Sequence, residues 1–336
     1  MATIREVATL AAVSIATVSH YLNKTKPVTE ETGRRVQAAI NQLNYQRDDM
    51  AAWLKTAGAP VVFIVYPHAD TSFFEDVAEE IEACLVPHGL NALRVRKSTI
   101  DRMLEGGALR SFLTRSAGII VLGHSNEWPN NAVEATSILP SVMLNWDDLN
   151  GFIEQGLHEH LDQGAATAMA YLAERGHRNI GLMTGPLLER GRGLLNGALA
   201  SAGSLGLNIA PQWIVQSSYD LRDSSNQARK MLESTERPTA LFTFGTQFAF
   251  GALQACYDLG IRVPDDISII SYIECRQADF SAPPLTTVAP SIAQLASHVV
   301  DRMVGLISGN AVNIQTSLDI QIVERSSVNP LKTSHQ

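Results

Sequence analysis

The sequence contains little cysteine and no long apolar run. Its three cysteines, Cys84, Cys256 and Cys275, lie far apart and form no C-x-x-C spacing, so neither a zinc knuckle nor a disulfide framework is expected. No segment approaches the roughly 18 uninterrupted apolar residues that a membrane span requires. The N-terminal residues MATIREV carry charges and lack the apolar region of a signal peptide. We therefore expect a protein of a reducing cytosol with no membrane partner.

Positive charge is also scarce. The chain has 26 Lys and Arg against 34 Asp and Glu, a net charge of −8. This negative charge disfavours nucleic-acid binding over the whole protein surface. The charge is uneven, because residues 1–57 hold seven basic and five acidic residues, a net +2 that leaves −10 for the remainder. Any contact with nucleic acid is therefore expected at the N-terminal end alone. The 336 residues, 45% of them hydrophobic, suffice for two domains with buried cores.

Three short helices are expected in the first 45 residues. The segment TIREVATLAA has Thr3 as a plausible N-cap and apolar residues at i, i+3, i+4 and i+7. After a turn at Ala12 and Val13, SIATVSHYL begins with Ser14 as N-cap, and TEETGRRVQAAINQLNY begins with Thr29. Because the first two helices are joined by a tight turn, the spacing predicts a helix-turn-helix unit.

The second of these helices lacks Lys, Arg, Asp and Glu from Val13 to Asn23. A helix in the major groove reads base edges with short hydroxyl, apolar and polar side chains, while flanking residues contact phosphates. Ile15 or Ala16 is suited to contact a thymine methyl group, and His20 is suited to donate a hydrogen bond to guanine. The candidate contact residues are Ile15, Ala16, Thr17, Ser19 and His20. The same pattern also fits a helix of a small bundle, with Ile15 and Tyr21 in its core.

Residues 3–45, TIREVATLAAVSIATVSHYLNKTKPVTEETGRRVQAAINQLNY, resemble the DNA-binding head of the lactose/galactose repressor (LacI/GalR) family. The family pattern is D-V-A-x-x-A-G-V-S-x-x-T-V-S-R, then V-S, T-R-x-x-V and a closing aromatic residue. The sequence departs from it at Ala12, where Gly is usual, at Gly33, where a larger residue is usual, and at His20, where Arg is usual. The resemblance implies that Ile15, Ala16 and His20 read bases and that Thr17 and Ser19 face phosphates. It further implies DNA contacts at Thr3, Ser14, Asn23, Thr29, Arg34, Tyr45, Ala51, Leu54 and Lys55.

The next segment, QRDDMAAWLKTAGAP, corresponds to the family's hinge helix. By resemblance it orders on operator binding and inserts Leu54 into the minor groove. The eight residues from Asp48 to Lys55 are too few for a stable isolated helix in water, so DNA and the partner protomer must stabilise it. Asp48 and Asp49 favour the helix N-terminus through the helix dipole but repel nearby phosphates. Trp53 is either a second wedge or a packing residue between domains.

The remainder of the chain alternates apolar runs with helical stretches or loops. The six runs are VVFIVYP, GIIVLG, SVMLN, NIGLMTG, TALFTFG and ISIISY, and such runs predict two parallel sheets covered on both faces. Catalytic motifs fail: GRGLLNG is one residue too long for G-x-G-x-x-G, and GHSNE does not end in Gly as G-x-S-x-G requires. His158 and His160 would share one side of a strand but lack the H-E-x-x-H spacing of a zinc site. We expect no enzyme, no cofactor and no metal.

The resemblance continues across this part and covers nearly the whole chain. YLAERGHRNIGLMTG resembles Y-L-x-x-x-G-H-R-x-I-x-x-x-x-G, and LGIRVPDDISIISY with PPLTTVAP resembles the family's later motifs. It implies an α/β fold: a three-helix head and hinge helix, then two doubly wound subdomains like those of periplasmic binding proteins. The expected boundaries are 1–46 for the head, 47–59 for hinge and linker, 60–158 with 290–318 for the N-terminal subdomain, 159–289 with 319–331 for the C-terminal subdomain, and 332–336 for a tail. Crossovers are expected near His158, Ala289 and Leu318.

The resemblance places an effector in the cleft between the subdomains. Arg190 corresponds to the family's effector-binding Arg, with Arg192 as the alternative, and Phe73 with Phe74 corresponds to an aromatic pair. The full expected set is Phe73, Phe74, His124, Asn145, His160, Arg190, Asp220, Thr246, Ile273 and Glu274.

The acids that bind sugar hydroxyls in this family are largely missing. Gly245 and Thr246 replace Asn-Asp, Ile273 replaces the first Asp of F-D-D, and His160 stands where Asp is common. Lost carboxylate contacts strongly disfavour a hydroxylated ligand, so a simple hexose is not the expected effector. An anionic or partly apolar ligand fits Arg190, His160 and the aromatic residues, and a body without a small ligand is the alternative.

The sequence therefore predicts a homodimeric transcriptional repressor of the bacterial cytoplasm, bound to the nucleoid when on DNA. Two-fold symmetry predicts a pseudo-palindromic double-stranded operator, and the cleft ligand is expected to change the angle between protomers and so the folding of the hinge. A solute-binding receptor with an inert head is the first alternative, and the missing signal peptide disfavours it as an exported receptor. Its cytosolic form, a receptor without regulatory DNA binding, is the alternative that stays open. An α/β enzyme is the second, which the failed motifs disfavour.

Overall fold

The computed structural model describes residues 3–23, 26–43, 45, 60–66, 72–105, 113, 116–123, 139–145, 156–187, 189–310 and 318–331. The chain divides into two compact units, Met1–Ala57 and Gly58–Gln336, which we name the head and the body and describe separately. The predicted hinge helix with Trp53 and the predicted tail lie outside the described residues.

The head contains the three predicted helices, α1 (Ile4–Leu10), α2 (Ile15–Asn23) and α3 (Glu30–Leu43). The Thr3 side chain accepts from the backbone N–H of Glu6, and the Glu6 side chain accepts from the backbone N–H of Thr3, so a capping box begins α1. Val7, Val18 and Val36, one from each helix, are fully buried and form the centre of the small core. The expected helix-turn-helix is therefore confirmed.

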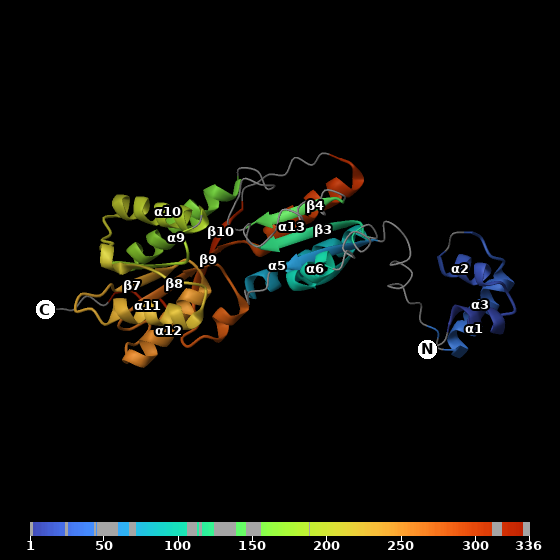
Figure 1. Ribbon diagram of the computed structural model, residues 1–336, viewed down its shortest axis with the longest axis horizontal. Coiled ribbons are helices and arrows are strands. Elements are labelled where there is room, and N and C mark those ends of the chain that lie inside the picture. The colour runs from blue at the N-terminus through green and yellow to red at the C-terminus, as the bar shows by residue number, and fades with distance from the viewer. Residues whose placement is uncertain are drawn as a thin grey trace. The chain divides into compact units, whose positions relative to one another are not determined.

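The first sheet of the body has four parallel strands in the order β2-β1-β3-β4. They are β1 (Val61–Tyr66), β2 (Asn91–Arg96), β3 (Gly118–Gly123) and β4 (Ser141–Asn145). The associated helices are α5 (Ser72–Leu85), the 3-10 turn η1 (Val86–His88), α6 (Lys97–Glu105) and α13 (Ile292–Ser308). Helices α5 and α13 contact each other and the sheet (Figure 1).

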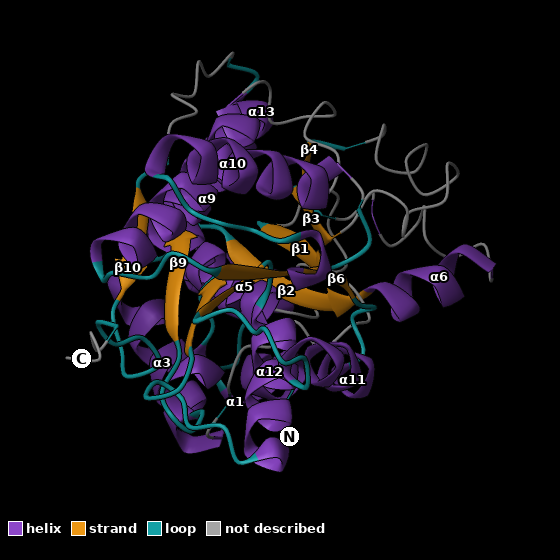
Figure 2. Cartoon of the chain, turned by 90° about the vertical axis from the view of Figure 1, so that its left-hand side faces the viewer, coloured by secondary structure: helices purple, strands orange, loops and turns teal. Residues whose placement is uncertain are grey.

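The second sheet has six strands in the order β10-β9-β8-β7-β5-β6, and only β10 is antiparallel to its neighbour. Its strands are β5 (Ile180–Thr184), β6 (Ile214–Gln216), β7 (Ala240–Thr243), β8 (Ser268–Tyr272), β9 (Thr286–Pro290) and β10 (Ile320–Val323). Its helices are α9 (Gly156–Glu174), α10 (Glu189–Leu205), α11 (Leu221–Leu232), α12 (Thr246–Leu259), η3 (Pro211–Trp213) and η4 (Arg276–Phe280). Helices α9 and α10 lie side by side on one face, and α11 and α12 lie side by side on the other (Figures 1 and 2).

The chain passes between the two sheets more than once. It leaves the first sheet after β4 for α9, which packs against the second sheet, and it leaves the second sheet after β9 for α13, which packs against the first. Strand β10 then pairs with β9. The residue-level subdomain boundaries stay predictions.

One sequence expectation in the body is wrong. Residues 158–160 lie in helix α9, not in a strand, so residues two apart do not share a side as they would on a strand. Among the described helices, none has the length and apolar character needed to cross a membrane.

Candidate DNA-binding surface and effector cleft

Helix α2 divides into a buried face and an exposed face. Val18 is fully buried, and Tyr21 with Leu22 packs against the head core. Ile15 is 45% exposed and Ala16 is exposed beside it, so the alternative that placed Ile15 in a bundle core is wrong. The predicted base-reading residues at the start of α2 therefore form an apolar, uncharged surface, as contact with thymine methyl groups requires. Ser19 and His20 are half-buried further along the helix.

The first turn of α2 is fixed by hydroxyl groups. The Ser14 Oγ accepts from the Thr17 backbone N–H at 3.0 Å and lies 2.8 Å from the Thr17 Oγ1, which confirms Ser14 as the N-cap. Thr29 likewise accepts from the Thr32 N–H at the start of α3. At α1, hydrogen bonds from Thr3, first from its backbone N–H, lower the pKa of the Glu6 carboxyl. The predicted DNA contacts Thr3, Ser14 and Thr29 thus act as helix caps.

The turn between α1 and α2 is held by an arginine of α3. Ala12 has a left-handed backbone, with φ 51°, at the position where Gly was expected from the resemblance. The Arg35 guanidinium donates from Nε to the Ala11 carbonyl at 3.0 Å and from Nη2 to the Ala12 carbonyl at 2.8 Å. Helix α1 has no basic residue in its last turn, so Arg35 supplies the positive charge that its C-terminus favours.

The departure at Gly33 has a packing reason. A Cβ at Gly33 would lie 3.0 Å from Cε2 of the Tyr21 ring, so a larger side chain would displace the ring. Tyr21 also donates to the Gln37 Oε1 at 3.1 Å, and both contacts join α2 to α3.

The remaining predicted head contacts differ in exposure. Arg34 is exposed and lies 3.9 Å from Glu30, a distant surface pair that leaves its guanidinium accessible to phosphate. Tyr45 packs against the head core. The structure describes the backbone of Asn23 only, and Ala51, Leu54 and Lys55 lie outside the described residues.

The predicted effector residues of the body follow the carboxyl ends of strands. Phe73 and Phe74 lie in the first turn of α5, which follows β1; both are buried, and their rings meet edge-on with centroids 5.6 Å apart. Thr246 begins α12 after β7 and is buried. Asp220 precedes α11 and accepts from the Asp223 N–H at 2.9 Å. This is the edge of a parallel sheet at which ligands bind in open α/β folds.

Aromatic rings also line the end of the second sheet. Tyr219 and Phe248 have centroids 5.7 Å apart, and a Cβ at Gly185 would lie 2.9 Å from Phe248 and 3.3 Å from Tyr219. The sequence reasoning missed Tyr219, although it directly precedes the predicted Asp220.

Ile273 and Glu274 follow β8 in an unusual conformation. Ile273 has φ 84° and is 5% exposed, and a positive φ is costly for a β-branched residue. Its backbone N–H donates to the Val288 carbonyl at 2.8 Å. The strained position is therefore fixed by its neighbours.

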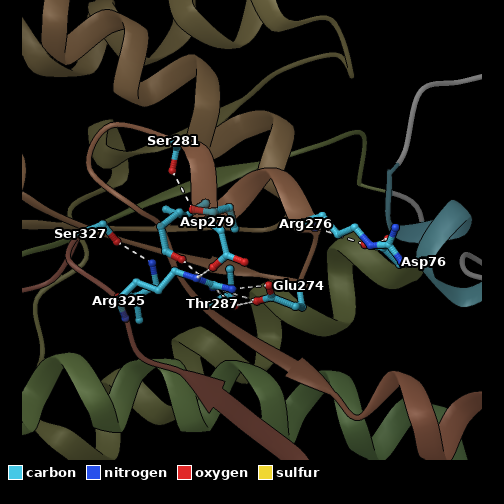
Figure 3. A network of polar contacts seen from close by, with 11 residues as sticks. Asp76, Glu274, Arg276, Asp279, Ser281, Thr287, Arg325 and Ser327 are labelled. Carbon is cyan, nitrogen blue, oxygen red and sulfur yellow. Dashed lines mark hydrogen bonds and ion pairs between the residues drawn. The ribbon is translucent and has the colours of Figure 1, made fainter. Parts of the chain in front are cut away.

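The Glu274 carboxylate is already engaged by other side chains (Figure 3). Arg325 donates to both of its oxygens, at 2.7 and 3.1 Å, and the Thr287 hydroxyl also donates to it. Arg325 is 11% exposed and pairs with Asp279 as well. Burial acts to lower the pKa of its guanidinium, but the hydrogen bonds to Glu274 and Asp279 together with the charges of these carboxylates outweigh burial and raise the pKa. Glu274 therefore anchors the loop after β8 and has little capacity left for a ligand.

A second arginine joins this loop to the first subdomain. Arg276, the first residue of η4, lies 2.8 Å from Asp76 of α5 (Figure 3). It also lies 2.6 Å from Glu79 of the same helix. Burial raises the pKa of the Asp76 carboxyl, and the hydrogen bond from the Arg276 backbone opposes the rise.

Several predicted cleft residues cannot be placed in this way. For Asn145, His160 and Arg190 the structure describes the backbone only, in β4, α9 and α10, and His124 lies outside the described residues. Within the described parts of the chain, no group of three or more His, Cys, Asp and Glu could hold a metal ion.

Comparison with known proteins agrees with this arrangement. Residues 3–48 match the family model of bacterial regulatory proteins of the lacI family, and residues 169–328 match that of the periplasmic binding protein-like domain. The HTH-type transcriptional repressor PurR of Proteus mirabilis (strain HI4320) is 32% identical over 334 residues, which cover 98% of this chain and 97% of that protein. The chain belongs to the LacI/GalR family. PurR of Edwardsiella ictaluri (strain 93-146) is 30% identical over 333 residues, with 98% and 97% covered.

Solved structures show the same fold for this LacI/GalR family member. A crystal structure of the lac repressor dimer bound to operator and the anti-inducer ONPF has a TM-score of 0.74 at 24% identity, with 98% of this chain and 99% of that chain covered. A lac repressor structure bound to ONPG in the repressed state has a TM-score of 0.75 at 24% identity, with 97% and 99% covered. The lacI family model and the PurR relatives show that the chain is a DNA-binding transcriptional regulator and not an enzyme.

The two arginines that organise the loop after β8 in this LacI/GalR protein were not predicted from the sequence. Arg325 lies 51 positions from Glu274, and Arg276 lies 200 positions from Asp76. Neither pair has a local spacing signal, because the contacts depend on how two sheets and two loops meet. The signal that was available is the acidic pair Asp76 and Glu79, three residues apart and therefore on one face of a helix.

Proposed function

We propose that this chain represses transcription by binding a pseudo-palindromic operator as a homodimer, under control of a small molecule in the cleft of the body. The observation that carries the proposal is the exposed, uncharged start of α2 at Ile15 and Ala16 within a helix-turn-helix head. The PurR and lac repressor relatives support repression and dimerisation. Acting on bacterial DNA, the protein would work in the cytoplasm, at the nucleoid when bound.

Selection of operators from random double-stranded DNA with the full chain tests this function. We expect an enriched pseudo-palindrome whose half-sites change when Ile15→Ala or His20→Ala is used, because these residues face base edges. Arg34→Ala should weaken binding to all sequences alike, because a phosphate contact carries no base information. A selection that enriches no sequence would contradict the function. Unchanged sequence preferences in both the Ile15→Ala and His20→Ala variants would show that these two residues do not read bases.

The hinge residues enter the proposal from the sequence alone. We assign Ala51, Leu54 and Lys55 to operator contact, with Leu54 at the central step of the minor groove. An inserted apolar side chain unstacks that step and bends the DNA, so a flexible pyrimidine–purine step is expected at the operator centre.

We further infer that the effector is not a simple hexose. Two observations support this: Ile273 provides no hydroxyl acceptor where the family has an acid, and the Glu274 carboxylate is occupied by Arg325 and Thr287. Arg190, His160, Phe73 and Phe74 favour an anionic or partly apolar ligand.

Thermal melts of the full chain with panels of hexoses, carboxylates and aromatic compounds test the ligand class. A ligand that binds the folded state at about 100 times its Kd stabilises by about 2.7 kcal/mol, which is readily measured. We expect carboxylates or aromatic compounds to raise the melting temperature and hexoses to leave it unchanged. Stabilisation by a hexose at millimolar concentration would contradict the inference, and no response to any compound would favour a body without a small ligand.

A further inference from the structure

The ion pair between Arg276 and helix α5 joins the two subdomains at the edge of the predicted cleft. Arg276 Nε lies 2.8 Å from Asp76 Oδ1 and Nη2 lies 2.6 Å from Glu79 Oε2, and the Arg276 backbone N–H donates to Asp76 Oδ2 at 3.2 Å. Asp76 is 12% exposed although Arg276 is 63% exposed. Helix α5 packs on the first sheet and η4 follows a strand of the second, so a movement of one subdomain relative to the other would alter this contact.

Each end of the ion pair is attached to one predicted wall of the effector site. On the first subdomain, Phe73 and Phe74 lie in the first turn of α5, and Asp76 follows within one helical turn of them. On the second, Ile273 and Glu274 precede Arg276 by three and two residues. Figure 3 shows Glu274 beside Arg325 and Arg276 extending from the adjoining loop toward Asp76. A ligand that moves either wall therefore moves one partner of the pair.

The loop that carries Arg276 is stiff enough to transmit such a movement. Arg325 holds Glu274 on one side of Arg276 and Asp279 on the other, and Cys275 is fully buried between Glu274 and Arg276. A displacement of Ile273 cannot be absorbed within this short segment without breaking the hydrogen bonds that Arg325 makes to Glu274 and Asp279. It is instead passed to the more exposed contact between Arg276 and α5.

We propose that Arg276 is the positioning residue that couples the effector cleft to the relative arrangement of the two subdomains, and through it to operator affinity. The proposal rests on the proposed function, because it takes the cleft as the effector site. A partly exposed ion pair adds little to global stability, yet it favours the single arrangement in which it forms. Its expected effect is at the low end of allosteric coupling, about 5- to 10-fold.

The test is Arg276→Gln in the full chain, with Arg262→Gln as the matched control. Arg262 is 68% exposed and pairs with Asp265 and Asp266 inside the C-terminal subdomain alone, and both substitutions change the body charge equally. We expect the Kd for the operator selected by the wild-type protein to change about 5- to 10-fold for Arg276→Gln, and less than about 2-fold for the control. Thermal melting of both variants should stay close to that of the wild type.

A second set of variants separates coupling from a local structural role. In a background with Asp76→Asn and Glu79→Gln, the further substitution Arg276→Gln should have no additional effect on operator Kd, because its partners are gone. Hydrogen exchange should also rise in residues 72–80 and 273–280 together for Arg276→Gln, and in neither for the control.

The outcomes are distinct. A wild-type chain that selects no operator contradicts the proposed function. An Arg276→Gln chain that binds the selected operator with unchanged Kd contradicts this inference alone. Additive effects in the Asp76→Asn and Glu79→Gln background, or a lowered melting temperature that accounts for the change in Kd, would also overturn it.

Discussion

Ala12 is the residue at which the head departs most visibly from an unstrained turn. Its φ of 51° is a conformation that costs an L-residue with a Cβ roughly 1–2 kcal/mol and that glycine adopts freely. Arg35 holds the turn by donating to the carbonyls of Ala11 and Ala12. The hydrogen bonds of one arginine therefore offset the strain of a missing glycine.

Ala12→Gly is expected to stabilise the head by about 0.5–1 kcal/mol. The relief of the left-handed strain exceeds the greater entropy that glycine gives the unfolded chain, about 0.4–1 kcal/mol. Hydrogen exchange of α1 and α2 amides in the full chain measures the change. Ala38→Gly is the control of opposite sign, because Ala38 is an exposed residue inside α3 and glycine there costs about 1 kcal/mol. Faster hydrogen exchange of the α1 and α2 amides in Ala12→Gly would contradict backbone strain at Ala12.

At the scale of the elements, the hydrophobic pattern and the helix caps were sufficient to predict much of the fold. The six predicted apolar runs correspond to β1, β3, β4, β5, β7 and β8, and all three head helices occur where periodicity and N-caps place them. Strand β2, NALRVR, escaped prediction because it is an edge strand with only Val95 buried. Strand β9 escaped because Thr286 and Thr287, although buried, are polar in sequence.

The candidate site was less predictable than the elements that carry it. The face of α2 follows from helical periodicity, so the exposure of Ile15 and Ala16 could be foreseen. Glu274 was predicted as a ligand contact because the sequence shows only its position after a strand. Its hydrogen-bond partner, Arg325, lies far away in the sequence, in the segment after β10. Tertiary partners of charged residues decide whether a carboxylate is available to a ligand, and no local pattern reports them.

On the scale of the whole molecule, charge is divided between head and body. The head carries a net +2 and the body −10, so the body repels DNA while the head attracts it. Not every cation of the head is available, because the Arg35 guanidinium is engaged by carbonyl groups. Arg34, its neighbour in sequence, is exposed. These two residues allow phosphate contact to be separated from positioning of the turn.

Operator binding is therefore expected to depend strongly on salt despite the acidic body. A dimer that contacts about six to ten phosphates should lose roughly 10³ to 10⁵ in affinity between 50 and 200 mM salt. Arg34→Gln should reduce the slope of log affinity against log salt by about one for each protomer, because one released counterion is lost. Arg35→Gln should weaken operator binding with the slope unchanged, because that guanidinium holds the α1–α2 turn.

Fluorescence anisotropy of a labelled operator across this salt range measures all three slopes. A flat response of the wild type would contradict phosphate contact by the head, and equal slope changes in both variants would show that Arg35 contacts phosphate as Arg34 does.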